Sequence, residues 1–430
     1  MHKLAVLACL AVLAALAACG SPEPPPDASP AATVPAAPPL DAATQGKWRH
    51  ARAGAPAAEP PEAAADVKAL PYLQGYRPAQ DHPVVVEHDR GAAFPGLNFY
   101  VSGHAAAAVL MDMGGRTLHR WRYPLRRLWP DLARDPGMAK LEYWRRAYLY
   151  PNGDLLGIYE GLGLVKLDAR SRVLWAHRGG IHHDLAVLAD GTIYALDREG
   201  KILPRINPKE GVFEDFVTVL DASGRPVRKI SILECFERSP FAGLLRGMPR
   251  SGDIFHTNTL EVLDGRFADR DPAFRKGNLL VSVLKLDTLA VLDPDRRMVV
   301  WARQGGWRRQ HQPTFLDNGH LLLFDNLGAG RDRSRVLELD PRTGETVWQF
   351  GGGRGVDFFS KTLGSCQRLP NGNTLITESE NGRAVEVTPA GRAVWEFYNP
   401  HRAGERGELV AVLFEMVRLP LDFPFHGTSR

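Results

Sequence analysis

A pair of short strands, repeated along most of the chain, leaves very few folds open to it. Each copy has an apolar strand, a polar turn with Asp or Gly, and a second strand that ends in an apolar residue, often Trp. Alternating apolar residues around a tight polar turn are typical of β-hairpins. About six copies can be traced, at residues 110–121, 165–175, 219–230, 291–301, 337–348 and 385–395. The chain is therefore predicted to consist of repeated antiparallel hairpins.

A second unit precedes most of these hairpins and has an apolar strand on each side of a tight turn. Its turns lie at Asn152-Gly153, Asp190-Gly191, Asn318-Gly319 and Asn371-Gly372. The two units together make one four-stranded antiparallel blade, and blades repeated in sequence close radially into a propeller. Residues 68–430, at about 50 to 60 residues per blade, give six blades. The predicted fold class is all-β, a six-bladed β-propeller, with short helices expected in insertions near residues 125–145 and 201–275.

The first residues have the pattern of an exported lipoprotein. A short positive start is followed by an apolar run, Leu4 to Ala18, which has the length of a signal peptide rather than of a membrane span. The run ends in Leu16-Ala17-Ala18-Cys19-Gly20, which resembles the bacterial lipobox. We therefore expect residues 1–18 to be a lipoprotein signal peptide and Cys19 to be lipidated. Acyl chains on Cys19 would hold the protein at a membrane without a transmembrane segment.

Residues 19–67 are dominated by Pro and Ala and contain almost no large apolar residue. Such a segment cannot bury enough surface to offset the entropy of ordering it, so we expect an extended, disordered linker. The expected location is the cell envelope, with the folded part facing the periplasm and contacting a membrane through the lipid anchor alone. Gly20 after the cysteine favours the outer membrane, by analogy with other lipoproteins.

Charge and cysteine content exclude several classes of function. The net charge is +4, and no basic stripe with interleaved aromatic residues is present, which argues against a nucleic-acid partner. Two basic clusters, residues 144–146 and 307–309, could favour a small anionic ligand. Cys235 and Cys366 are the cysteines left in the folded part, and the sequence leaves open whether they pair. No metal site of the CxxC type is present, and neither a metal nor a cofactor is assigned.

Three of the fourteen histidines share one position in the repeat. The first strand of a blade lines the central channel, and its first residues lie about eight positions before the turn glycine. Eight positions before Gly191 and Gly319 lie His183 and His311, and nine before Gly265 lies His256. The same count from Gly153 gives Arg145. We therefore expect three imidazoles and one guanidinium to converge at one mouth of the channel.

Histidines are rarely used to fill an apolar channel, because each ring nitrogen needs a partner. Converging histidines suit a metal site, general acid–base catalysis, or group transfer with a ring nitrogen as nucleophile. The residues by themselves leave these alternatives open, including a three-histidine zinc site.

Four segments of the chain resemble the bacterial arylsulfotransferase family. They are His183 through Tyr194, Phe255-His256-Thr257-Asn258, Gln310 through Asn326, and Asp357 through Asn373. The resemblance extends over about residues 80 to 420 and is carried mainly by the His-x-Asn and Gln-His motifs on successive blades.

The resemblance implies a periplasmic six-bladed propeller that moves a sulfuryl group from a phenolic sulfate ester to a phenol. The resemblance also implies ping-pong kinetics. It implies that the reaction uses neither a nucleotide sulfate donor nor a cofactor. The family's nucleophile falls on His311, which would form a sulfohistidine, and its supporting histidines fall on His183 and His256. Its asparagine falls on Asn258, which with Arg145 and Arg309 is expected to bind substrate.

The chain departs from the family pattern at two places. The family has an arginine at the end of the strand after His-x-Asn, where this chain has Leu284, and the adjacent Lys285 is expected to point away by strand alternation. Arg145, Arg308 or Arg309 could hold the sulfuryl group instead. The family's vicinal cysteine pair is also not evident.

Two other functions remain open from the sequence. A propeller lipoprotein without catalytic activity could bind a small anionic ligand or a partner protein at the channel mouth, since fold alone does not determine function. A quinoprotein-type dehydrogenase is suggested by residues 340–344 followed by Trp348, but this motif occurs cleanly once.

Overall fold

The computed structural model describes residues 77–134, 142–351, 353 and 357–425. These residues all belong to one compact unit, Gly46–Arg430. The predicted signal peptide, the predicted lipidation site Cys19 and the predicted linker lie outside the described residues. No helix in the described ranges is long and apolar enough to cross a membrane.

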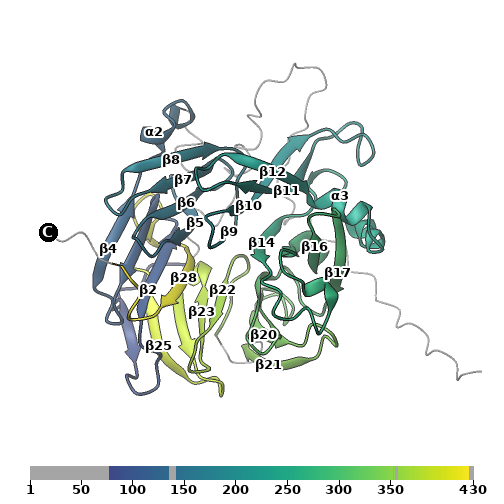
Figure 1. The fold of residues 1–430 in the computed structure, drawn as a ribbon. Helices are drawn as coiled ribbons and strands as arrows, with labels where there is room; N and C mark the ends of the chain where they lie inside the picture. Colours follow the sequence, from purple (N-terminus) through teal and green to yellow (C-terminus); the bar gives the residue numbers. More distant parts are fainter. Residues whose placement is uncertain (1–76, 135–141, 352, 354–356, 426–430) are drawn as a thin grey trace, which may run out of the picture. The chain divides into compact units, whose positions relative to one another are not determined.

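Six antiparallel sheets are arranged around a common centre (Figure 1), which confirms the predicted six-bladed β-propeller. Blade 1 contains, from the centre outward, β28 (Leu413–Leu419), β2 (Leu97–Ser102), β3 (Ala107–Met111) and β4 (Thr117–Arg122). Blade 2 contains β5 (Trp144–Leu149), β6 (Leu155–Tyr159), β7 (Gly163–Leu167) and β8 (Val173–Arg178). Blade 3 contains β9 (Leu185–Val187), β10 (Ile193–Lys201), β11 (Val212–Leu220) and β12 (Pro226–Ser231), and β13 (Gly252–Asp253) pairs with β11.

The other three blades follow in chain order. Blade 4 contains β14 (Thr257–Val262), β15 (Leu279–Val283), β16 (Thr288–Asp293) and β17 (Met298–Gln304). Blade 5 contains β18 (His311–Phe315), β19 (Leu321–Asp325), β20 (Arg335–Leu339) and β21 (Thr346–Gly351). Blade 6 contains β22 (Ser365–Arg368), β23 (Thr374–Glu378), β24 (Arg383–Val387), β25 (Ala393–Tyr398) and, as its outermost strand, β1 (Val85–His88). The strands β26 (Arg402–Ala403) and β27 (Leu409–Val410) form a separate hairpin.

The two ends of the propeller close the ring by exchanging strands. The last strand, β28, is the inner strand of blade 1, whereas the first strand, β1, is the outer strand of blade 6. A buried ion pair lies at this seam: Arg418 of β28 binds Glu386 of β24 at 2.9 Å, and both side chains are fully buried. Joining the ends in this way leaves few strand edges unpaired.

Tryptophans that end the predicted hairpins link four of the blades to the next one. Four of them donate their indole N–H to a backbone carbonyl in a turn of the following blade. The pairs are Trp121 with Gly153, Trp175 with Ala222, Trp348 with Pro389 and Trp395 with Met113. An indole combines a large apolar ring with one donor, so the same residue packs between blades and satisfies a turn carbonyl. This contact explains why Trp recurs at this position.

The predicted turns and insertions are also found. Gly153 and Gly191 have φ values of 84° and 85°, which glycine adopts without strain. The insertions contain short helices, as predicted. They are α2 (Leu125–Leu128), η3 (Leu132–Arg134), α3 (Ile232–Glu237), η5 (Ala242–Gly247) and η6 (Pro272–Phe274). Cys235 and Cys366 are both free and buried, in separate apolar clusters, and burial raises the pKa of each thiol to about 12.

A polar network crosses the channel and contacts all six blades. At its centre Arg146 binds Asp184 at 2.8 Å and Glu415 at 2.6 Å. Asp184 also accepts the backbone N–H of Leu260 at 2.9 Å, and Glu415 accepts the side-chain amide of Gln312 at 2.9 Å. The side-chain oxygen of the same Gln312 accepts the backbone N–H of Cys366 at 3.2 Å. Side chains of this network line a cavity of about 780 Å³ that extends toward the turns at Asn318 and Gly372.

Candidate functional site

The three predicted histidines lie at the starts of successive inner strands. His311 is the first residue of β18, His256 directly precedes β14, and His183 lies two residues before β9. The rings of His183 and His256 are in edge-to-face contact, with centroids 4.8 Å apart. Both residues have a left-handed backbone, with φ of 52° and 50°. This conformation is unfavourable for histidine, and such strain is concentrated at functional sites.

The protonation of the His311 ring follows from its contacts. Its Nδ1 lies 2.7 Å from Oδ1 of Asn326 and 3.0 Å from the carbonyl oxygen of Arg309. The amide nitrogen of Asn326 donates to the carbonyls of Ser360 and Leu363, at 2.7 and 2.5 Å, which determines which way this amide faces. Nδ1 of His311 therefore faces two acceptors and must carry the proton, so Nε2 carries the lone pair.

His311 is also held in its neutral form. Burial and, to a lesser extent, the charges of Arg145 and His256 together lower its pKa to about 3, against the hydrogen bonds with Asn326 and the Arg309 carbonyl, which raise it. A neutral imidazole with a free Nε2 is a competent nucleophile at ordinary pH.

His256 is paired with a carboxylate. Asp253 contacts the Nδ1 of His256 and also accepts its backbone N–H at 2.8 Å. Burial alone would raise the pKa of Asp253, but the charges of His256, Lys285 and Arg198 hold it below its usual value. The side chain of His256 is 21% exposed, more than those of the other two histidines. With Nδ1 directed at a carboxylate, Nε2 of His256 is the atom that can exchange protons with a bound molecule.

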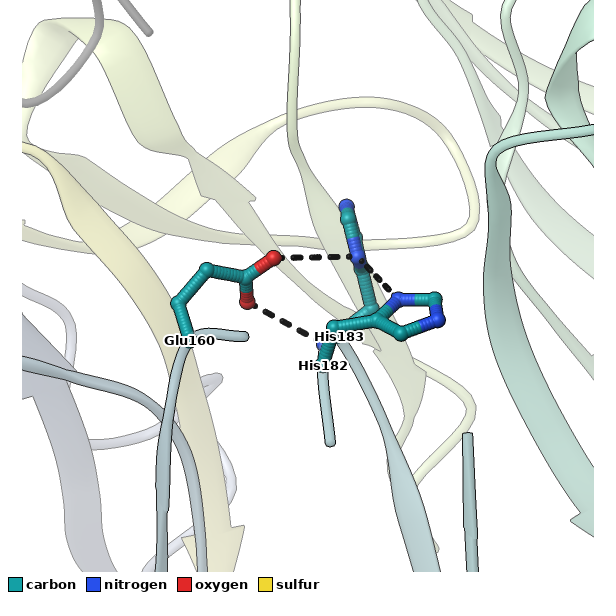
Figure 2. Close-up of side chains that lie close together, drawn as sticks. All are labelled: Glu160, His182 and His183. Carbon is teal, nitrogen blue, oxygen red and sulfur yellow. Dashed lines mark hydrogen bonds and ion pairs between the residues drawn. The ribbon is translucent and has the colours of Figure 1, made fainter. Parts of the chain in front are cut away.

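His183 contacts two other buried residues, Glu160 and His182 (Figure 2). Its Nδ1 lies 3.4 Å from Oε1 of Glu160 and 2.8 Å from Nδ1 of His182. Burial lowers the pKa of both histidines well below 6.5. Within the described ranges, Glu160, His182 and His183 form the one group of three or more His, Cys, Asp or Glu side chains whose ligand atoms all lie within 4.8 Å of one another. The three predicted histidines do not form such a group, so the three-histidine zinc site has no support in the structure.

Arg145 lies at the predicted position, near both His183 and His311. Its side chain is 5% exposed and packs over the ring of Phe414, and its positive charge lowers the pKa of both histidines. Its Nε has no hydrogen-bond partner among the residues that the structure describes. A buried guanidinium with a donor to spare is suited to bind an anion.

Asn258, through its side chain, and Arg309, through its backbone, connect neighbouring parts of the site. The Asn258 amide donates to the carbonyl of Gln310 at 2.8 Å and accepts the hydroxyl of Thr259 at 3.1 Å, so it ties β14 to the start of β18. Arg309 contributes its carbonyl to His311, and its own N–H binds Asp287 at 2.8 Å.

The prediction that Lys285 points away from the site is wrong. It assumed a continuous strand, but β15 ends at Val283 and Leu284–Leu286 forms a 3₁₀ turn (η7). The charge of Lys285 acts on Asp253, the partner of His256, so Lys285 lies beside the site. Strand alternation no longer applies once the backbone turns.

Several residues of the site were not found from the sequence. They are Glu160, His182, Arg198, Asp215, Asp253 and Asn326. Two of them carry a local signal: His182 adjoins His183, and Asp253 lies three residues before His256. The others come from the second or third strands of their blades or from the residues that directly follow them, and their contacts depend on how the blades pack.

Comparisons with known proteins give the family of the chain. Among solved structures, it is similar to a protein of unknown function from Bacteroides caccae (13% identity, 75% of this chain, 98% of that chain, TM-score 0.47). It is also similar to the WD40 β-propeller domain of Doa1 (13% identity, 80% of this chain, 94% of that chain, TM-score 0.43). A streptogramin B lyase is similar as well (11% identity, 74% of this chain, 85% of that chain, TM-score 0.41). A search of curated proteins found no match. The family model for arylsulfotransferase (ASST) matches residues 163–400, which is more than half of the chain. The chain therefore belongs to the arylsulfotransferase family.

Proposed function

We propose that this protein transfers a sulfuryl group from a phenolic sulfate ester to a phenol through a sulfohistidine on His311. The observation that carries the proposal is the fixed tautomer of His311, whose Nδ1 faces two acceptors and whose Nε2 is left unprotonated. Family membership supports the same activity. The chain is thereby proposed to need no nucleotide sulfate donor.

In the first half-reaction, Nε2 of His311 attacks the sulfur of the donor. An N–S bond forms as the bond between sulfur and the aryl oxygen breaks, and the leaving phenolate takes a proton from His256. In the second half-reaction, an acceptor phenol returns a proton to His256 and its oxygen attacks the sulfur, so that the N–S bond breaks. Splitting the transfer in this way predicts ping-pong kinetics.

Positive charge and N–H donors are needed at the peripheral oxygens of the sulfuryl group. Sulfuryl transfer, like phosphoryl transfer, develops charge on these oxygens in a loose transition state. We assign this role to Arg145 and His183, because the charge of Arg145 acts on both His183 and His311, and the ring of His183 contacts that of His256. Arg145 would thus do the work of the family arginine that is replaced by Leu284.

A chromogenic substrate tests this activity. The purified protein is given p-nitrophenyl sulfate with and without phenol, and release of p-nitrophenol is followed. We expect phenol to accelerate release and phenyl sulfate to form in equal amount. If a range of aryl sulfates gives no turnover above the uncatalysed rate, the protein is a binding propeller and the proposal fails.

Arg145→Gln is expected to lower kcat/KM by about 100-fold, because one preorganised donor to a developing anion contributes on that order. The matched control is Arg116→Gln, an exposed arginine paired with Asp112, which should leave kcat/KM unchanged. Steady-state kinetics with p-nitrophenyl sulfate measure both. Equal values for Arg145→Gln and the unmodified protein would remove Arg145 from the site.

Activity should persist on the acid side of neutrality. His311 becomes protonated, and inactive as a nucleophile, only as the pH falls through its lowered pKa of about 3. As the pH is lowered, we therefore expect log(kcat/KM) to show no decline with an apparent pKa near 6.5. Samples quenched in alkali report p-nitrophenol at each pH. Asp215, whose pKa is raised to about 7 chiefly by burial, could also titrate here, so Asp215→Asn is measured in parallel. An acid limb near 6.5 that persists in Asp215→Asn would contradict the neutral state of His311.

A further inference from the structure

The group formed by Glu160, His182 and His183 is buried between blades 2 and 3. Glu160 directly follows β6, and the two histidines precede β9. The three residues are 0%, 1% and 3% exposed. Oε1 of Glu160 and Nδ1 of His182 both approach Nδ1 of His183 (Figure 2). Three potential ligand atoms thus lie around one buried point.

With Glu160 ionised, neither placement of one proton between the two Nδ1 atoms pairs every polar atom of this group. If Nδ1 of His183 donates to His182, then Nε2 of His182 must carry a proton, and it is buried without a hydrogen-bond partner among the described residues. If His182 donates instead, the lone pair of His183 Nδ1 faces the carboxylate oxygen 3.4 Å away. In either case Oε1 of Glu160 accepts no hydrogen bond in the described part of the chain. Leaving such atoms buried and unpaired destabilises the folded state.

We propose that Glu160, His182 and His183 bind a divalent transition-metal ion, for which Zn²⁺ is the best fit. Two neutral imidazole nitrogens and one carboxylate oxygen are ligands that Zn²⁺ takes, with a fourth position open. An ion at this point uses the lone pairs of both Nδ1 atoms and of Oε1 at once, which neither of these proton placements achieves, although Nε2 of His182 carries its proton in the bound state as well.

Two of the three distances between the ligand atoms are close to those of such a site, and all three atoms lie within 4.8 Å of one another. Two ligands of a tetrahedral zinc ion, each at about 2.0–2.1 Å, lie about 3.3 Å apart. The pair of His183 Nδ1 and Glu160 Oε1, at 3.4 Å, matches this separation, and the pair of Nδ1 atoms, at 2.8 Å, needs to open by about half an ångström.

A carboxylate lies behind one of the ligands. Nε2 of His182 points toward Oδ1 of Asp215 at 3.9 Å. Metal-bound histidines usually donate their second N–H to a carboxylate, which fixes the ring and its tautomer. Arg198 lies 4.0 Å from the same Oε1 of Glu160, and its positive charge and that of Arg145 both act on His183, whereas the negative charge of Asp253 acts on His182.

The ion would determine the tautomer of His183. With Nδ1 bound to metal, the proton of His183 must sit on Nε2, which is the form that donates to an anion. This consequence rests on the proposed function, in which His183 binds a sulfuryl oxygen, whereas the binding site itself does not.

Zinc binding is tested on the full chain, first stripped with a chelator and then titrated with ZnCl₂ by calorimetry. We expect one ion per chain with Kd below about 1 µM, and elemental analysis after dialysis should give the same stoichiometry. Zinc should also raise the Tm of the stripped protein, since it binds only the folded state. If the unmodified protein binds no zinc at one equivalent, the proposal is overturned.

Variants locate the ion. Glu160→Gln and His182→Gln should each weaken zinc binding by more than about 100-fold, and Asp215→Asn by about 10- to 100-fold. The matched control is His320→Gln, which removes a histidine paired with Glu338 at 2.8 Å elsewhere in the propeller and should bind zinc normally. Zinc binding by Glu160→Gln equal to that of the unmodified protein would contradict the assignment.

One more variant separates this proposal from the enzymatic one. His311→Ala removes the proposed nucleophile but no ligand, so it should lose activity and still bind one zinc ion. If the unmodified protein binds zinc but shows no turnover, the proposed function alone is contradicted. If it shows turnover but binds no zinc, the metal site alone is contradicted.

Discussion

Replacement of His311 by alanine is expected to lower kcat for aryl sulfate turnover by about 10⁴-fold or more, because it removes the atom that forms the covalent intermediate. The ring is 4% exposed and its Nδ1 is held by Asn326 and the Arg309 carbonyl, so only Nε2 is available for attack. Initial rates with p-nitrophenyl sulfate and phenol measure the effect, with circular dichroism to show that the variant is folded.

His320→Ala is the matched control for this experiment. His320 belongs to the same blade, is partly exposed and pairs with Glu338 rather than with the site. It should keep the activity of the unmodified protein. Turnover by His311→Ala within about tenfold of that level would remove His311 from the role of nucleophile.

Replacement of Arg146 by leucine is expected to lower the free energy of unfolding by about 3–5 kcal/mol, because it leaves two buried carboxylates without their partner. Asp184 and Glu415 both bind this guanidinium, and through them it connects inner strands from all six blades. Burial already raises the pKa of Asp184 against the opposing charge of Arg146. Urea unfolding monitored by tryptophan fluorescence gives the change.

Two controls make this result specific. Arg116→Leu removes an exposed ion pair with Asp112 and should change the free energy of unfolding by less than about 1 kcal/mol. Arg146→Lys keeps the charge but loses the forked guanidinium that reaches both carboxylates. Its loss of unfolding free energy should therefore lie between those of Arg116→Leu and Arg146→Leu. A loss below about 1 kcal/mol in Arg146→Leu would show that the network does not stabilise the ring.

The blades could be predicted because their signals are local. An Asn-Gly turn between apolar strands sets hairpin register within a few residues, and the glycines adopt the left-handed backbone that such turns need. The strand exchange that closes the ring could not be predicted this way. The pairing of β28 with β2, and of β1 with β25, joins segments about 300 residues apart and has no local signature.

The histidines could be predicted because a repeat places equivalent residues at equivalent positions. Counting from turn glycines located His183, His256 and His311, and also Arg145, at the starts of inner strands. Asn326 and Glu160 could not be found by this count, because each follows the second strand of its blade. Their side chains reach the histidines only through packing between strands. Lys285 was misplaced because a 3₁₀ turn replaces the expected end of a strand.

The most direct test is to isolate the covalent intermediate. The protein is mixed with excess p-nitrophenyl sulfate without acceptor, quenched in alkali, digested and examined by mass spectrometry. We predict that the peptide containing His311 gains the mass of one SO₃ group, and that phenol added before the quench removes this gain and yields phenyl sulfate. Turnover with phenol but no sulfated His311 peptide, or sulfation of a different residue, would contradict the account.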